Sequence, residues 1–144
     1  FDSEGVNSNT LQLIENGILK NYLVDTYNGK KLNLKSNGRS GGTTNLYFEK
    51  GNISYEDLMK KNSRSLYITE TIGHGSNIVT GDYSVGATGF LVEDGEFKYP
   101  VNEITIAGNF KDMFKNIILA NDLEFEYSVN SPTMMIEGMT VAGK

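Results

Sequence analysis

The chain has 144 residues, of which 38% are hydrophobic and 22% are charged, and its formal net charge is −5. We expect one soluble domain over residues 1–144, because a chain of about 150 residues buries roughly 70% of its unfolded surface. The acidic balance weighs against binding to a nucleic-acid backbone, and no apolar run approaches the roughly 20 residues of a membrane-spanning helix. Without Cys the sequence has no disulfide framework and no thiolate metal site, which agrees with a cytoplasmic protein.

The first predicted element is a β-hairpin over residues 10–24. Apolar residues flank Asn16-Gly17, and both of these residues tolerate the positive φ angles of a type I′ turn. The chain before it begins with Phe1, without an initiator Met or a signal-peptide pattern, so we expect a fragment of a longer protein.

The middle of the chain alternates turn-rich and apolar segments. Residues 37–44 are rich in Gly, Ser and Thr and predict a flexible loop. Residues 45–49 predict a short strand, and Ser54 is a suitable N-cap for a helix that follows it. Residues 66–71 predict a strand that leads into a polar loop around His74.

A second hairpin is predicted at residues 91–98, around Asp94-Gly95. It matches residues 13–20 at six of eight positions when Ile and Val, and Asn and Asp, are counted as equivalent. The match indicates either an internal duplication or two unrelated tight hairpins that share an Asx-Gly turn.

The last third of the chain predicts three strand regions and one helix. Ile104 and Ile106 alternate with polar residues, as do the apolar residues of segment 124–129, and residues 134–141 predict a final pair of short strands. The helix is expected after Asn109, with a helical stripe made of Phe110, Met113, Phe114, Ile117 and Ile118. The predicted fold class is α+β, mainly antiparallel β-sheet with β-hairpins and two helices packed on the sheet.

The only histidine, His74, lies between two glycines in a loop crowded with polar side chains. A catalytic triad with Ser76 or Ser84 and Asp82 is one interpretation, but no nucleophile-elbow pattern surrounds either serine. One His without Cys cannot build a hydrolytic zinc site. The imidazole could instead brace the loop through the backbone or Asp82, or it could contact a peptide or partner.

Several blocks of the sequence resemble the PmbA/TldD family, in order and nearly end to end, and the similarity is to the C-terminal domain of its PmbA (TldE) branch. The blocks are residues 2–6, 13–17, 66–75, 79–84, 99–109 and 136–143. The resemblance implies a bacterial, cytosolic zinc metallopeptidase complex of TldD and PmbA/TldE subunits that processes small unfolded or modified peptides. An older name for the family's PmbA branch is modulator of DNA gyrase.

The resemblance also implies which subunit this chain represents. In the family, TldD supplies the zinc from an upstream His-Glu-x-x-x-His helix and carries a Cys in a Gly-rich insertion after a Gly-Asn-Asp-Leu motif. This chain has Ala120-Asn121-Asp122-Leu123 and then reaches Pro132 without a Cys or an insertion. We therefore expect the non-metal subunit, with no cofactor in this chain and zinc in a TldD-like partner.

The resulting expectation is a non-catalytic domain that lines a peptide path or a subunit interface. The residues expected to do so are His74, Ser76, Asn77, Asp82, Tyr83 and Ser84. The expected partners are a TldD-like or homologous subunit and a peptide substrate, with neither membrane nor nucleic acid. The alternatives are a regulatory binding protein of the gyrase-modulator type and an independent hydrolase that uses His74.

Overall fold

The computed structural model describes residues 1–143, and these form two compact units. The first unit comprises Phe1–Leu46 together with Tyr127–Val129, and the second comprises the remaining described residues. No helix among the described residues has both the length and the apolar character needed to cross a membrane. The α+β class with mainly antiparallel sheets is confirmed, whereas the single domain over residues 1–144 stays a prediction.

The first unit contains the predicted N-terminal hairpin. Strands β1 (Ile14–Glu15) and β2 (Ile18–Leu19) pair antiparallel, and Glu15 lies opposite Ile18. Asn16 (φ 50°) and Gly17 (φ 76°) form the turn between them, as a type I′ turn requires. The turn prediction is confirmed, but the strands are only two residues long.

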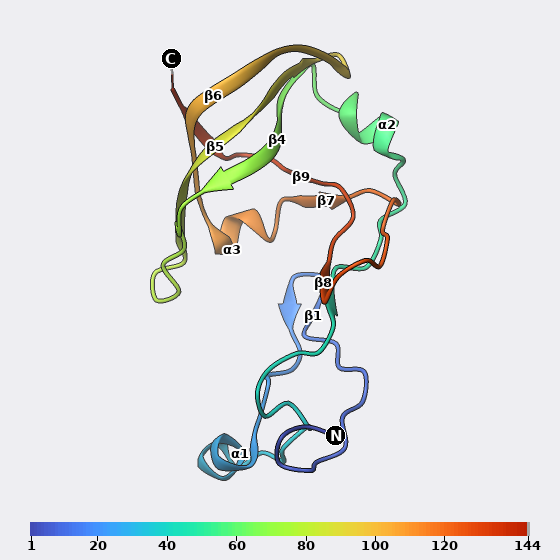
Figure 1. The fold of residues 1–144 in the computed structure, drawn as a ribbon, viewed down its shortest axis with the longest axis vertical. Helices are drawn as coiled ribbons and strands as arrows, with labels where there is room; N and C mark the ends of the chain where they lie inside the picture. Colours follow the sequence, from blue (N-terminus) through green and yellow to red (C-terminus); the bar gives the residue numbers. More distant parts are fainter. Residues whose placement is uncertain (144) are drawn as a thin grey trace. The chain divides into compact units, whose positions relative to one another are not determined.

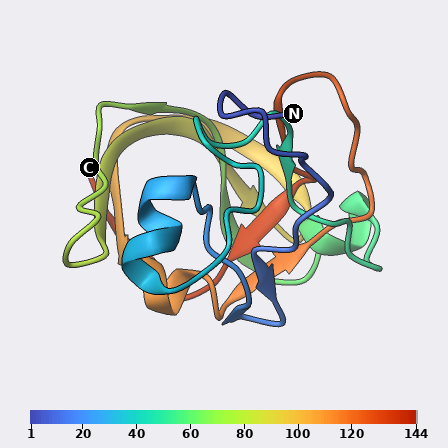
Figure 2. The same ribbon diagram turned by 90° about the horizontal axis from the view of Figure 1, so that it is seen from below.

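The first unit also contains helix α1 (Thr26–Leu32), which was not predicted (Figure 1 and Figure 2). Asp25 caps its N-terminus, since the carboxylate accepts the backbone N–H of Asn28 at 2.6 Å. Asn33, with φ 55°, ends the helix in a left-handed conformation. The dipeptide Asn28-Gly29 is typical of turns, and this local signal hides the helix in the sequence.

Two boundaries between the units fall within short strands. These strands are β3 (Leu46–Tyr47), which confirms the strand expected at residues 45–49, and β8 (Val129–Asn130). The longer strand expected over residues 124–129 is wrong. Of residues 124–129, Val129 alone belongs to a strand, and the side chains of Phe125 and Tyr127 are 67% and 75% exposed, unlike those of a buried strand face.

The second unit is built on a four-stranded antiparallel sheet with the order β10-β6-β5-β4 (Figure 1). Its strands are β4 (Arg64–Ile72), β5 (Asp82–Glu93), β6 (Glu96–Asn109) and β10 (Thr140–Ala142). The strand expected at residues 66–71 and the strand through Ile104 and Ile106 are therefore confirmed.

A long hairpin of β5 and β6 forms the centre of this sheet. Asp94 (φ 51°) and Gly95 (φ 84°) form its turn between the paired residues Glu93 and Glu96, which confirms the predicted turn. One face of the sheet carries a buried cluster of Val85, Ala87, Ile104 and Ile106, against which pack Leu66, Ile68, Tyr83, Val101 and Met139.

Both predicted helices are present in the second unit, and one of them is shorter than predicted. Helix α2 (Tyr55–Met59) begins after Ser54, whose hydroxyl accepts the backbone N–H of Asp57 at 3.0 Å. Helix α3 (Phe110–Met113) begins after Asn109, whose side chain accepts the N–H of Lys111 at 3.1 Å. Both N-caps agree with the sequence prediction.

The extension of α3 to Ile118 is wrong. The chain leaves the helix after Met113 and enters strand β7 (Ile117–Leu119), which pairs antiparallel with β9 (Met134–Ile136). Two adjacent isoleucines fit a helical stripe but also favour a strand, and here sheet pairing decided between the two. The final strands β9 and β10 both exist, although β9 pairs with β7 and β10 pairs with β6.

Two glycines of β5 provide a matched test of this packing. A Cβ at Gly89 would overlap the backbone carbonyl of Tyr67 in β4, whereas a Cβ at Gly86 would lie 3.6 Å from Cβ of Ile72, an ordinary contact. We expect Gly89→Ala to lower the free energy of unfolding by about 1–3 kcal/mol or more, because a backbone atom must move. Gly86→Ala should change it by less than about 1 kcal/mol. Denaturant unfolding measures both, and equal effects would contradict the close approach of β4 and β5.

Candidate functional site

The candidate site is the connection between β4 and β5, which extends beyond the ends of both strands in the second unit (Figure 1). Gly73 (φ 96°) and Gly81 (φ 82°) adopt conformations that other residues rarely reach. Gly75 lies so close to β5 that a Cβ would overlap the carbonyl of Ser84. The glycines beside His74 are therefore required by the backbone conformation of the loop.

Asn77 and Asp82 brace this loop from within. The side-chain oxygen of Asn77 accepts the backbone N–H groups of Val79 at 3.0 Å and Thr80 at 3.2 Å. The carboxylate of Asp82 accepts the hydroxyl of Thr80 at 2.7 Å and the amide of Asn109 at 3.0 Å. Two predicted site residues are thus structural parts of the loop, which they hold in one shape.

Asn109 connects the loop to the start of α3. Its amide nitrogen donates to Asp82 and, at 3.2 Å, to the backbone carbonyl of Thr80, while its oxygen caps the helix. The N–H of Phe110 also donates to the carbonyl of Gly81 at 2.8 Å. Sequence reasoning identified Asn109 as a cap but missed its bonds to the loop, which depend on the pairing of Asp82 with Asn109 across β5 and β6.

The hydrogen bonds around Asp82 lower the pKa of its carboxyl group below the usual value of 3.8. The bond from Thr80 contributes most and the bond from Asn109 second, because each stabilises the ionised form. Asp82 is therefore a charged hydrogen-bond acceptor at neutral pH and not a proton donor.

The other predicted residues differ in their surroundings. His74 is exposed, and among residues 1–143 its imidazole has no hydrogen bond or ion pair, so the bracing role that was one interpretation of His74 is not formed. Ser76 and Ser84 are exposed, and neither hydroxyl bonds to His74. Tyr83 is half-buried, with its ring 5.5 Å from that of Phe110. The hydrogen bonds that define a catalytic triad are not formed between these residues.

Sequence reasoning missed two apolar residues at the tip of the loop. Ile78 and Val79 are 92% and 89% exposed, although the turn that carries them is held by hydrogen bonds. Two adjacent β-branched residues within a polar loop are the sequence signal that could have identified them. An ordered loop that presents His74, Ile78 and Val79 to solvent is suited to contact another molecule.

The described residues do not fit a zinc site. No group of three or more His, Cys, Asp or Glu side chains lies close enough together within residues 1–143 to hold a metal ion. The chain has one His and no Cys, whereas catalytic zinc sites use three protein ligands drawn mostly from these residue types and carboxylates. No step through zinc is therefore assigned to this chain.

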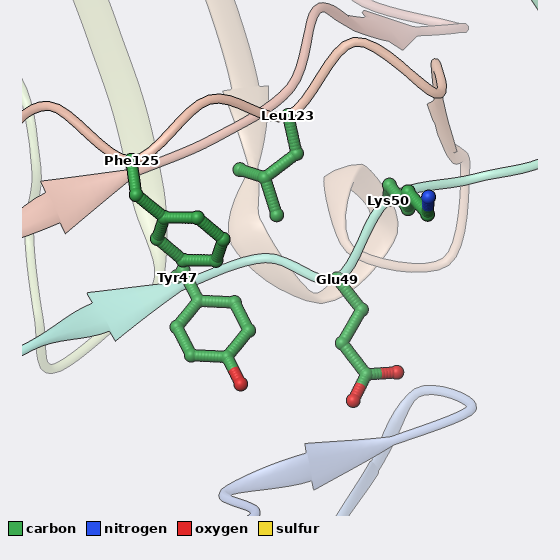
Figure 3. Close-up of a pocket in the computed structure, with 5 residues that line it drawn as sticks. All are labelled: Tyr47, Glu49, Lys50, Leu123 and Phe125. Atoms are coloured by element: carbon green, nitrogen blue, oxygen red, sulfur yellow. The ribbon is translucent and has the colours of Figure 1, made fainter.

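An open hollow of about 400 Å³ lies elsewhere in the second unit (Figure 3). The rings of Tyr47 and Phe125 meet edge to face there, with centroids 5.1 Å apart. Figure 3 shows the Glu49 side chain extending to the same side as the Tyr47 ring, whereas Lys50 lies farther from both rings. The fifth lining residue, Leu123, ends the Ala120-Asn121-Asp122-Leu123 motif. None of the predicted site residues lines this hollow.

The motif itself is held in place by hydrogen bonds. The carbonyl of Ala120 accepts the N–H of Gly51 at 2.7 Å, and the N–H of Asn121 donates to the carbonyl of Ile53 at 2.9 Å. The carboxylate of Asp122 accepts the N–H and the hydroxyl of Thr133 at 2.8 Å and 2.7 Å. Burial raises the pKa of Asp122, but these bonds outweigh burial, so the net pKa is lowered. These bonds give the motif a structural role in the second unit.

The chain is similar to curated proteins named as metalloproteases. It is 46% identical over 145 residues to the metalloprotease PmbA homolog of Buchnera aphidicola from Baizongia pistaciae, which covers 99% of this chain and 32% of that protein. It is 43% identical over 145 residues to metalloprotease PmbA of Escherichia coli, covering 100% of this chain and 32% of the other. The chain thus spans about a third of the length of these relatives.

Solved structures share the fold. A Thermotoga maritima protein named as a modulator of a DNA gyrase superposes with a TM-score of 0.90 at 36% identity, over 99% of this chain and 35% of that protein. TldE from Thermococcus kodakarensis gives a TM-score of 0.80 at 30% identity, over 99% of this chain and 36% of the other. Residues 1–143 also match the model of the PmbA/TldA metallopeptidase C-terminal domain. The chain belongs to the PmbA/TldD family, as a C-terminal domain of that family.

Proposed function

We propose that this chain is the C-terminal domain of a PmbA/TldE-type subunit in a zinc metallopeptidase complex that processes small unfolded or modified peptides. Sequence identity supports the assignment to this branch: it is 46% and 43% with two PmbA proteins but 27% with the TldD homolog of Buchnera aphidicola from Schizaphis graminum. The alignment with that TldD homolog extends over 169 residues, against 145 for either PmbA. This agrees with a chain that lacks a TldD insertion.

The zinc of the proposed complex belongs to a TldD-like subunit, and when bound it would activate water for peptide hydrolysis. The metal-ligating residues of this chain support the assignment of zinc to the other subunit, because a lone exposed His cannot supply three ligands. The role of this domain is then to contact the peptide or the partner subunit through the loop of residues 73–84.

The shape of this loop supports a contact role. Asn77, Asp82 and Asn109 hold the backbone, so little conformational entropy is lost when a partner binds. Ile78 and Val79 offer apolar surface, and His74 in the same loop offers an exposed hydrogen-bonding group. An extended peptide could also pair with β4, which forms an edge of the four-stranded sheet, through main-chain hydrogen bonds that tolerate varied sequences.

The decisive experiment reconstitutes the complex. The protein that carries this domain is mixed with a TldD-type subunit, and cleavage of an unstructured fluorogenic peptide is followed. We expect cleavage by the mixture only, its loss after chelation and its recovery with added zinc. Chelator-resistant cleavage by this protein alone would contradict the proposal and support a hydrolase that uses His74. Tight, salt-dependent binding to DNA would instead favour the gyrase-modulator alternative.

Substitutions at the loop tip test the contact role. We expect His74→Ala and the pair Ile78→Ser/Val79→Ser to reduce peptide cleavage or subunit affinity by about tenfold, since apolar contacts of this size contribute on the order of 1–2 kcal/mol. Thermal stability should not change, because these side chains are exposed. Lys115→Ala, an exposed residue outside the loop, is the control. Unchanged assembly and cleavage in both loop variants would reject the contact role.

The brace at Asp82 predicts how the loop responds to pH. The folded-state pKa lies below the unfolded value, so the brace is fully present above the unfolded pKa and is lost as the pH falls through the folded pKa. After correction for the intrinsic rate of amide exchange, which itself falls with pH in this range, the hydrogen-exchange protection of the loop should therefore decrease below about pH 4. Asp82→Asn, which keeps an acceptor oxygen without a titratable group, should remove this pH dependence. Equal pH dependence in wild type and variant would show that Asp82 is not responsible.

A further inference from the structure

Three Asn-Gly dipeptides occur in the chain, at Asn16, Asn28 and Asn37, and all three lie in the first unit. Asparagine before glycine is the chemically most labile form of this residue, because glycine leaves its backbone nitrogen free to approach the side chain. By sequence the three sites are equally labile, but in the structure they differ in hydrogen bonding and burial.

Asn28 is protected within α1. Its amide nitrogen donates to the carboxylate of Asp25 at 3.1 Å. The N–H of the following Gly29 is also engaged, since it donates to the carbonyl of Asp25 at 2.9 Å, and Gly29 is buried. The side-chain amide of Asn28 and the backbone nitrogen of Gly29, which would have to react with each other, are therefore both engaged in hydrogen bonds.

Asn37 is protected by its role in the first unit. Its side-chain oxygen accepts the N–H of Val24 at 3.0 Å, and its amide nitrogen donates to the carbonyl of Tyr22 at 2.8 Å. The following Gly38 is buried, and a Cβ there would overlap the backbone of Asn7. Reaction at Asn37 would require this side chain to give up both bonds.

Asn16 has none of these restraints. It is exposed, and among residues 1–143 neither its carboxamide nor the N–H of Gly17 has a hydrogen-bond partner. The strands β1 and β2 on either side are two residues each, and a two-stranded hairpin this short is marginally stable in water even with the flanking bond from the N–H of Lys20 to the carbonyl of Leu13. Opening releases Asn16 from its positive φ and lets the Gly17 nitrogen reach the side chain.

We propose that Asn16 is a site of spontaneous deamidation. The Gly17 nitrogen attacks Cγ of Asn16, a bond forms between these atoms, and the bond from Cγ to Nδ2 breaks. Ammonia leaves with the proton lost from the Gly17 nitrogen, and a succinimide ring remains. Water then opens either carbonyl of the ring and gives an aspartyl or an isoaspartyl residue at position 16.

The second hairpin shows which product the fold accommodates. Asp94-Gly95 has nearly the same φ angles as Asn16-Gly17, 51° and 84° against 50° and 76°. An aspartyl residue at position 16 therefore fits the turn, whereas an isoaspartyl residue adds a backbone methylene and breaks the pairing of β1 with β2. Asp94 can form the same succinimide by loss of water, but it closes a hairpin of 12- and 14-residue strands and donates its N–H to Ser63 at 3.0 Å.

The test incubates the purified full chain in warm, mildly alkaline buffer and maps the modified peptides by mass spectrometry. We expect conversion at Asn16 to exceed that at Asn28 or Asn37 by roughly tenfold, which corresponds to about 1.4 kcal/mol of lost hydrogen bonding at the protected sites. An isoaspartyl methyltransferase assay should give a signal at position 16 and little at Asp94.

Two controls make the outcome decisive. In denaturant the three Asn-Gly sites should convert at similar rates, because the protection depends on the fold. Asn16→Gln should remove the signal at position 16, and Asn16→Asp should retain the hairpin by NMR. Equal conversion of the three sites in the folded chain, or faster conversion at Asn28 or Asn37, would overturn the proposal.

Discussion

The pairing of β5 with β4 on one side and β6 on the other is the constraint on which the second unit depends. It places Val85 and Ala87 beside Ile104 and Ile106, and these four residues form a buried cluster of the core. Because strand pairing requires backbones to lie close together, it also explains why Gly89 cannot carry a Cβ. The same pairing sets Asp82 opposite Asn109, so the shape of the candidate loop follows from the register of the sheet.

The loop illustrates how a polar cluster divides into structural and available groups. Asn77 and Asp82 satisfy the backbone and neighbouring side chains, while His74, Ile78 and Val79 remain exposed. A loop that is already ordered loses little conformational entropy when it binds another molecule, which favours its use as a contact surface. A loop that only connects two strands has no need of such order. In the proposed function, these contacts are made with a peptide or a related subunit.

The elements predicted correctly are those whose signals are local. Asx-Gly turns at residues 16–17 and 94–95 and the N-caps Ser54 and Asn109 depend on φ angles and nearby hydrogen bonds, which the residue types control directly. The errors concern segments with two local options. Residues 117–119 fit a helical stripe and a strand equally, and pairing with β9 decided the outcome. No element was predicted for the segment of α1, which contains the turn-favouring dipeptide Asn28-Gly29.

By itself the sequence determined the α+β class, the two tight hairpins, the starts of α2 and α3 and the family, because each rests on residue types at short spacing. The tertiary structure decided which polar groups are occupied and which are free. Asp82 bonds to Thr80 and Asn109 and leaves His74 without a partner within the described chain, and Asn37 is held where Asn16 is not. Such differences arise from contacts between residues far apart in sequence, so identical dipeptides acquire different chemistry.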